Sequence, residues 1–205
     1  MNHKYGAELW MAVSFCVVLI LAAVVLFDMG MGEKGTIAAL RLTARLSFLL
    51  FWLAYAGGAM AKLFGPPFAI LARHGRYFGL SFAAAHLVHI GLIVWLFHVS
   101  DHPPVLTSGF ILFECVGLVW IYVLAALSVE RLRAALSPHL WRLLYAIGLE
   151  YIALVFFFNF VVNPIRYGAL HPIQYLPFSV LIVVGPVLRW AAMKQSHGGP
   201  TATPI

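Results

Sequence analysis

The sequence predicts an all-α integral membrane protein, a bundle of six transmembrane helices with both termini in the cytoplasm. Hydrophobic residues make up 63% and charged residues 10% of the 205 residues, and the mean hydropathy is +0.95. A soluble domain carries about 25% charged residues. Apolar stretches that approach or exceed the roughly 20 residues needed to cross a bilayer occur at Leu9–Phe27, Ala39–Phe64, Tyr77–Phe97, Gly109–Ser128, Trp141–Val162 and Tyr175–Met193.

The first three spans are separated by residues that end helices. The first span follows a basic residue, Lys4, and in this respect it is like the apolar part of a signal peptide. Its run is too long for a signal peptide and no small-residue cleavage site follows it, so we expect a retained helix. The Gly-rich stretch 29–37 separates spans one and two, a Gly-Pro-Pro sequence at 65–67 ends span two, and His-Pro-Pro at 102–104 follows span three.

The last three spans complete one domain, residues 1–195. Cys16 and Cys115 both fall inside spans, which argues against a disulfide framework. Residues 196–205 contain two Gly and two Pro, and we expect them to form a disordered tail. The spans occupy most of the chain, so flavin or nicotinamide chemistry would have to come from a partner protein.

The basic residues predict which side of the membrane each loop occupies. The loop between spans three and four has no Lys or Arg, and the loop between spans five and six has only Arg166. The loops between spans two and three and between spans four and five are basic, as is the segment at the end of span six, and their basic residues are Arg73, Arg76, Arg131, Arg133, Arg189 and Lys194. By the positive-inside rule both termini are cytoplasmic, which suits a multi-pass protein of the inner (cell) membrane. Arg41 and Arg45, at the outer end of span two, are exceptions. The basic residues therefore indicate topology and contact with the lipid bilayer, and we expect no nucleic acid partner.

Two histidines lie inside the apolar run 78–97. His86 and His89 are three residues apart, which places their side chains about 60° apart around a helix. An ionisable residue at bilayer depth is costly and indicates a functional site by default. A neutral imidazole in this setting suits a metal ion or a heme iron, and the alternative is that both rings bond to neighbouring helices. With a rise of about 1.5 Å per residue, His86 lies near mid-membrane and His89 nearer the outer leaflet.

Two carboxylates also fall within spans, Glu114 in the outer part of span four and Glu150 near the middle of span five. Each is a proton-handling group, a partner for a histidine, or a protonated donor in a structural hydrogen bond. Asn159 and Asn163 lie toward the outer end of span five, where we expect hydrogen bonds between helices.

The basic, Gly-containing segment 73–80 (RHGRYFGL) leads into span three and is followed by His86 and His89. It resembles the third helix of the ferric reductase-like transmembrane domain superfamily. That superfamily includes the membrane subunit of the periplasmic methionine sulfoxide reductase system and, more distantly, the NADPH oxidases. In these proteins such an entry leads to a histidine that ligates b-type heme. His89 lies at the matching distance from Gly79, so the resemblance implies that His89 binds heme iron, with His86 as a second candidate.

Span five, which begins with 141–148 (WRLLYAIG), also resembles this superfamily, and the resemblance covers roughly residues 37–165. The family usually carries histidines where this chain has Leu144 and Phe157, and span five contains no histidine. Because His86 and His89 project from one side of one helix, they cannot straddle a heme plane. A second imidazole would come from an oligomeric neighbour or from His98, His102 or His171 on the outer side. Otherwise the heme is five-coordinate or the site has been lost. His74 and His139 are weaker candidates, for a second, inner heme.

The resemblance implies a membrane heme b protein that carries electrons across the bilayer to an outer-side acceptor or a partner reductase. Such a protein is an oxidoreductase component without its own flavin or nicotinamide domain, and its donor would be a quinone or a flavoprotein. Two alternatives stay open. The chain is a non-catalytic accessory or assembly subunit of a larger membrane complex, or it is a small proton-coupled transporter that uses the two histidines and two glutamates as a relay.

Overall fold

The computed structural model describes residues 3–103, 107–166 and 172–197, and over these residues the chain is helical with no strand. The helices are α1 (His3–Met29), α2 (Glu33–Phe64), η1 (Pro66–Phe68), α3 (Ala69–Val99), α4 (Ser108–Leu127), α5 (Glu130–Ala134), α6 (Pro138–Phe157), η2 (Phe158–Val162), α7 (Asn163–Arg166) and α8 (Pro172–His197). Six helical segments in this part of the chain are long and apolar enough to cross a membrane. The all-α fold and the six predicted spans are therefore confirmed, and the chain is a multi-pass membrane protein.

The helices extend beyond the predicted spans where polar residues start or end them. The predicted loop 29–37 is reduced to residues 30–32, because α2 begins at Glu33 and the Thr36 hydroxyl donates to the Gly32 carbonyl at 2.9 Å. Gly30 turns the chain with a φ of 88°, a conformation that favours glycine. A Cβ atom at Gly35 would clash with the Gly30 carbonyl. Hydropathy cannot detect these added turns, because their residues are of mixed polarity.

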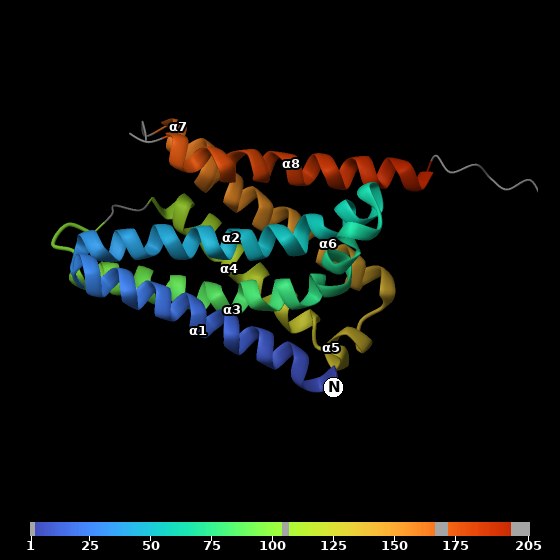
Figure 1. Ribbon diagram of the computed structural model, residues 1–205, viewed down its shortest axis with the longest axis horizontal. Coiled ribbons are helices and arrows are strands. Elements are labelled where there is room, and N and C mark those ends of the chain that lie inside the picture. The colour runs from blue at the N-terminus through green and yellow to red at the C-terminus, as the bar shows by residue number, and fades with distance from the viewer. Residues whose placement is uncertain (1–2, 104–106, 167–171, 198–205) are drawn as a thin grey trace, which may run out of the picture.

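The first three helices pack side by side, and α8 runs along α2 on the other side of the bundle (Figure 1). Helix α4 packs mainly against α6 and has few contacts with α3. Helix α1 begins and α8 ends toward the same end of the bundle (Figure 1). An even number of spans requires this, because each pair of spans returns the chain to the side on which it began. That this end is cytoplasmic stays a prediction from the basic loops.

Two buried clusters hold the bundle together. Small and β-branched residues join α1, α2 and α3, among them Val18, Ala22, Ala39, Ala85 and Val88. Such residues let helices approach closely. Aromatic rings fill the space between α2, α3, α6 and α8, and the main members are Phe48, Phe51, Phe82, Phe156, Phe160 and Phe178. Phe48 is central, with ring centroids 5.1 Å from Phe156 and 5.0 Å from Phe160.

The helix at 138–166 changes its hydrogen-bonding pattern near the outer end. Residues Phe158–Val162 form a π-helical turn, a feature often found at functional sites. The Ser179 hydroxyl on α8 donates to the carbonyl of Phe160 in this turn at 2.7 Å. This bond joins the irregular turn to α8 and supports its geometry.

Arg45, an exception to the predicted charge distribution, is held by aromatic rings of α8. Its guanidinium carbon lies 5.5 Å from the Phe178 ring centroid and 5.7 Å from that of Tyr175, and NH2 lies 3.5 Å from Oε1 of Gln174. These contacts account for an arginine at the outer end of α2 without a change in topology.

Candidate functional site

His86 and His89 lie together on one face of α3, as their spacing predicts. Their ring centroids are 5.2 Å apart with an interplanar angle of 30°. His86 also packs against Phe82, at 5.5 Å between ring centroids. Counting along α3 from Ala69 to Val99 places both rings well away from either end of the helix.

Thr43 on α2 orients the ring of His89. Nδ1 of His89 lies 2.9 Å from the buried Thr43 hydroxyl oxygen, and that hydroxyl donates to the carbonyl of Leu40 at 3.2 Å. The roles in this bond depend on the tautomer of the ring. With the proton on Nδ1 the ring donates to Thr43 and Nε2 keeps a lone pair, whereas with the proton on Nε2 the Thr43 hydroxyl donates to Nδ1. An imidazole that ligates a metal is held in this way through its other nitrogen.

Two buried polar atoms, one in this pair and one on α2, have no hydrogen-bond partner among the described residues. They are Nδ1 of His86 and Oγ of Ser47. Helices α2 and α3 are antiparallel and Thr43 meets His89, so Ser47, four residues further along α2, is level with Ala85 and His86. Buried polar groups are normally paired, and these two atoms are exceptions, as are the Tyr122 hydroxyl and Nε1 of Trp141 elsewhere in the described residues.

The other predicted histidines do not join the pair. His98 packs against Trp95 near the outer end of α3, with ring centroids 5.7 Å apart, and His102 is exposed in the following loop. His74 bonds to the Ile70 carbonyl in its own helical turn at 2.9 Å. His139 is exposed in the first turn of α6, and His171 lies outside the described residues.

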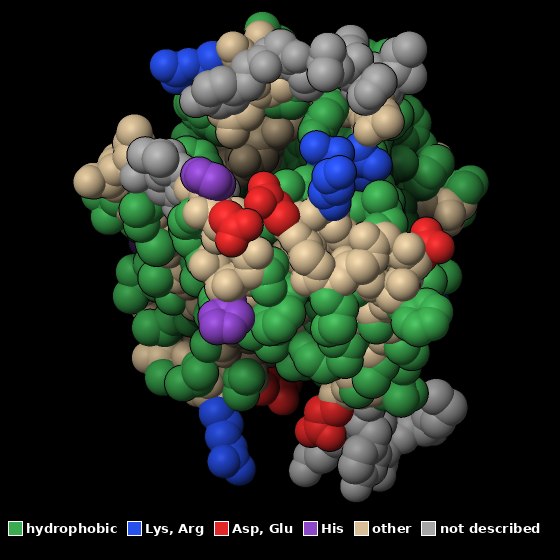
Figure 2. Space-filling model, turned by 90° about the vertical axis from the view of Figure 1, so that its left-hand side faces the viewer, with side chains coloured by type: hydrophobic (Ala, Val, Ile, Leu, Met, Phe, Trp, Pro, Cys, Tyr) green, Lys and Arg blue, Asp and Glu red, His purple; other side chains and the backbone are tan. Residues whose placement is uncertain are grey.

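Figure 2 shows the end of the bundle at which α1 ends and α2 begins. Acidic, basic and histidine side chains gather on this face and apolar side chains surround them (Figure 2). Among its residues, Glu33 accepts a hydrogen bond from the Ser100 hydroxyl at 3.0 Å, and Asp101 and His102 are exposed. The polar residues at this end of the bundle are therefore separate from the histidine pair inside it.

Glu114 belongs to a chain of amide hydrogen bonds. Nδ2 of Asn159, in the π-helical turn, donates to Oε1 of Glu114 at 2.9 Å, and Nδ2 of Asn163 donates to Oδ1 of Asn159 at 3.3 Å. The predicted hydrogen bonding of Asn159 between helices is confirmed. Glu114 accordingly has an asparagine as its hydrogen-bond partner.

Glu150 is the centre of a cluster that joins α2, α6 and α8. Its Oε2 accepts from the Tyr55 hydroxyl at 2.7 Å, and its Oε1 lies 3.1 Å from NH2 of Arg189. The Arg189 guanidinium carbon lies 4.4 Å from the Tyr55 ring centroid. Sequence reasoning identified Glu150 but missed Tyr55, and it took Arg189 only as a topology signal. These partners are far away along the chain, so no local pattern could identify them.

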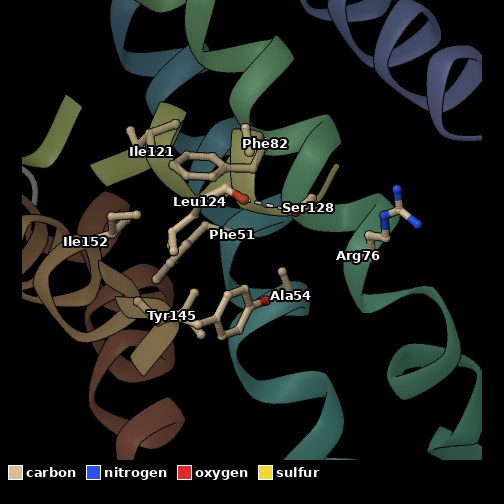
Figure 3. Close-up of a pocket in the computed structure, with 12 residues that line it drawn as sticks. Phe51, Ala54, Arg76, Phe82, Ile121, Leu124, Ser128, Tyr145 and Ile152 are labelled. Carbon is tan, nitrogen blue, oxygen red and sulfur yellow. Dashed lines mark hydrogen bonds between the residues drawn. The ribbon is translucent and has the colours of Figure 1, made fainter. Parts of the chain in front are cut away.

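A small cavity lies between α2, α3, α4 and α6, and neither His86 nor His89 lines it. Its volume is about 30 Å³, room for about two water molecules. Phe51, Phe82, Leu124 and Ile152 line it, while the guanidinium of Arg76 points away from it (Figure 3). Aromatic and aliphatic side chains thus occupy the centre of the four helices.

A heme iron would take one ligand from this pair, His89. The ring of His89 is held through Nδ1, but the described residues bring no histidine from another helix to face it. Also, no group of three or more His, Cys, Asp or Glu side chains in the described ranges is arranged to hold a metal ion. A second ligand would come from His171, from a partner chain or from a small exogenous molecule. Comparison of the chain with models of protein families, with curated proteins and with solved structures gave no match.

Proposed function

We propose that this protein binds b-type heme through Nε2 of His89 and serves as an electron-transfer component of the cell membrane. The observation that carries the proposal is the contact between the Thr43 hydroxyl and Nδ1 of His89, which orients the ring inside the bundle and, with the proton on Nδ1, leaves Nε2 available. The resemblance of segments 73–80 and 141–148 to the ferric reductase-like domain supports the same assignment.

Thr43, His86 and the surrounding helices each have a role in this proposal. Thr43 orients the ring of His89, and His86 packs against that ring, with 5.2 Å between the ring centroids, and restricts its rotation. The surrounding helices keep the site in a low-dielectric environment. A bound b-type heme supplies a one-electron iron couple whose potential depends on axial ligation and burial. The donor would be a quinone or a flavoprotein, and the acceptor would lie on the outer side.

The test is the visible spectrum of detergent-purified protein from heme-replete cells, oxidised and then reduced with dithionite. We expect a Soret band with reduced b-type peaks in the wild type and in His98→Ala, the matched control on the same helix. His89→Gly should lose the bands and regain them when imidazole is added, which separates ligand loss from misfolding. Colourless wild-type protein would refute the proposal, as would His89→Gly with an unchanged spectrum.

A second candidate is a non-catalytic accessory or assembly subunit. The aromatic packing of the centre favours it, because Phe48, Phe51, Phe82 and Phe156 occupy space between the helices and the cavity beside them holds only about 30 Å³. Co-purification in fixed stoichiometry with a larger membrane complex, together with colourless protein, would favour this function over heme binding.

A further inference from the structure

The carboxylate of Glu150 is partly exposed on the outer surface of the bundle, away from both ends of α6. Its side chain is 53% exposed. It lies twelve residues from Pro138, the first residue of α6, which corresponds to about 18 Å along the helix axis. In a membrane this surface faces lipid unless another protein covers it.

The exposed residues around Glu150 form a regular stripe on α6. Leu143, Ile147 and Leu154 are all exposed, and with Glu150 they follow the four-three-four spacing of a helix-packing seam. Apolar residues at these positions are compatible with lipid. The carboxylate in the middle of the stripe is not, because a charged side chain within the hydrocarbon is costly.

Contacts within the chain satisfy only part of this carboxylate. A carboxylate has about four acceptor sites, and here Tyr55 and Arg189 approach from the α2 and α8 side. Arg189 also donates from NH1 to the Tyr55 carbonyl at 3.3 Å, and its side chain is 26% exposed. The surface therefore presents a carboxylate and a guanidinium side by side, each with remaining hydrogen-bonding capacity.

We infer that this face of α6 and α8 is the contact surface between two copies of the chain. A two-fold interface has to be self-complementary, and a patch that carries one carboxylate and one guanidinium within an apolar stripe meets this condition. Two copies place two glutamates and two arginines together with no net charge, and each carboxylate gains donors from the partner. Lipid acyl chains offer this carboxylate no hydrogen-bond donor, whereas a second copy brings its own Arg189, so a second copy is the better occupant.

The first test is disulfide cross-linking in lipid vesicles at low protein density. Cys16 and Cys115 are both exposed, so the background is Cys16→Ser with Cys115→Ser. In that background we expect Ile147→Cys and Leu154→Cys to form a covalent dimer under mild oxidation. Val94→Cys is the control, because Val94 is 66% exposed and lies on α3 rather than on α6. Equal yields from all three variants, absence of a dimer from the α6 variants, or cross-linking of the α6 variants only to a different polypeptide would each overturn the inference.

The second test measures the role of the ion pair. Glu150→Gln keeps the shape of the side chain and one acceptor but removes the charge. We expect the dissociation constant of the dimer to rise by about tenfold or more. Light scattering of the cysteine-free protein across a dilution series gives the dissociation constant. Tyr55→Phe, which removes a bond inside the chain, serves as the control for indirect effects. A monomer at all concentrations, or no difference between Glu150→Gln and the parent, would contradict the inference independently of any heme spectrum.

Discussion

Two adjacent glycines on α2 provide a matched test of how the helices pack. A Cβ atom at Gly57 would lie 2.9 Å from Cβ of Leu71 and 3.4 Å from its carbonyl carbon and oxygen. A Cβ atom at Gly58 would meet nothing within 4 Å. Gly57→Ala therefore forces α2 against the first turn of α3, whereas Gly58→Ala points into open space.

The expected magnitudes follow from two opposing effects. Each substitution gains up to about 1 kcal/mol from the higher helix propensity of alanine. Gly57→Ala also introduces overpacking, which typically costs about 1–3 kcal/mol. Leu71 cannot relieve the contact by a side-chain rotation, because the clash involves its Cβ and its backbone. Since the propensity gain is common to both variants, we expect Gly57→Ala to be less stable than Gly58→Ala by about 1–3 kcal/mol.

The assay is reversible unfolding in mixed micelles, with helicity followed as the denaturing detergent is increased. Both variants are compared with the parent protein under identical lipid and detergent conditions. Equal free energies of unfolding within about 0.5 kcal/mol would refute the reasoning, because the close approach of α2 to Leu71 would then have no energetic consequence.

Three further substitutions test other parts of the packing in the same unfolding assay. Phe48→Ala should cost about 3–5 kcal/mol, because the ring is fully buried, whereas Phe97→Ala, at a residue 43% exposed, should cost far less; similar losses would contradict the proposed core. Asn159→Ala should cost about 1–3 kcal/mol by leaving Glu114 without its amide donor, and a double-mutant cycle with Glu114→Ala should show coupling, whereas strict additivity would exclude the bond. Trp52→Phe should cost about 1 kcal/mol, because its Nε1 donates to the Leu181 carbonyl at 2.7 Å, and an unchanged free energy would show that this bond does not contribute.

The fold class could be predicted because membrane helices are recognised from local composition. Each span carries enough apolar residues in sequence to cross the bilayer, and the periodicity of a helix places His86 and His89 on one face without knowledge of their neighbours. The ends of the helices were less predictable. Residues 33–38 and 69–76 have mixed polarity, and their helical state depends on turn geometry at Gly30 and Gly65.

The amino-acid sequence by itself thus determined six spans, their order and the presence of His, Glu and Asn side chains inside them. Only the tertiary structure decided the partners of those side chains. Thr43 meets His89 across 46 positions of chain, and Tyr55 meets Glu150 across 95. These contacts depend on which helix faces pack together, and in lipid that choice is made by close fit and interhelical hydrogen bonds rather than by hydrophobicity. A hydropathy pattern carries little information about such pairings, because apolar side chains on these helices suit lipid and another helix equally well.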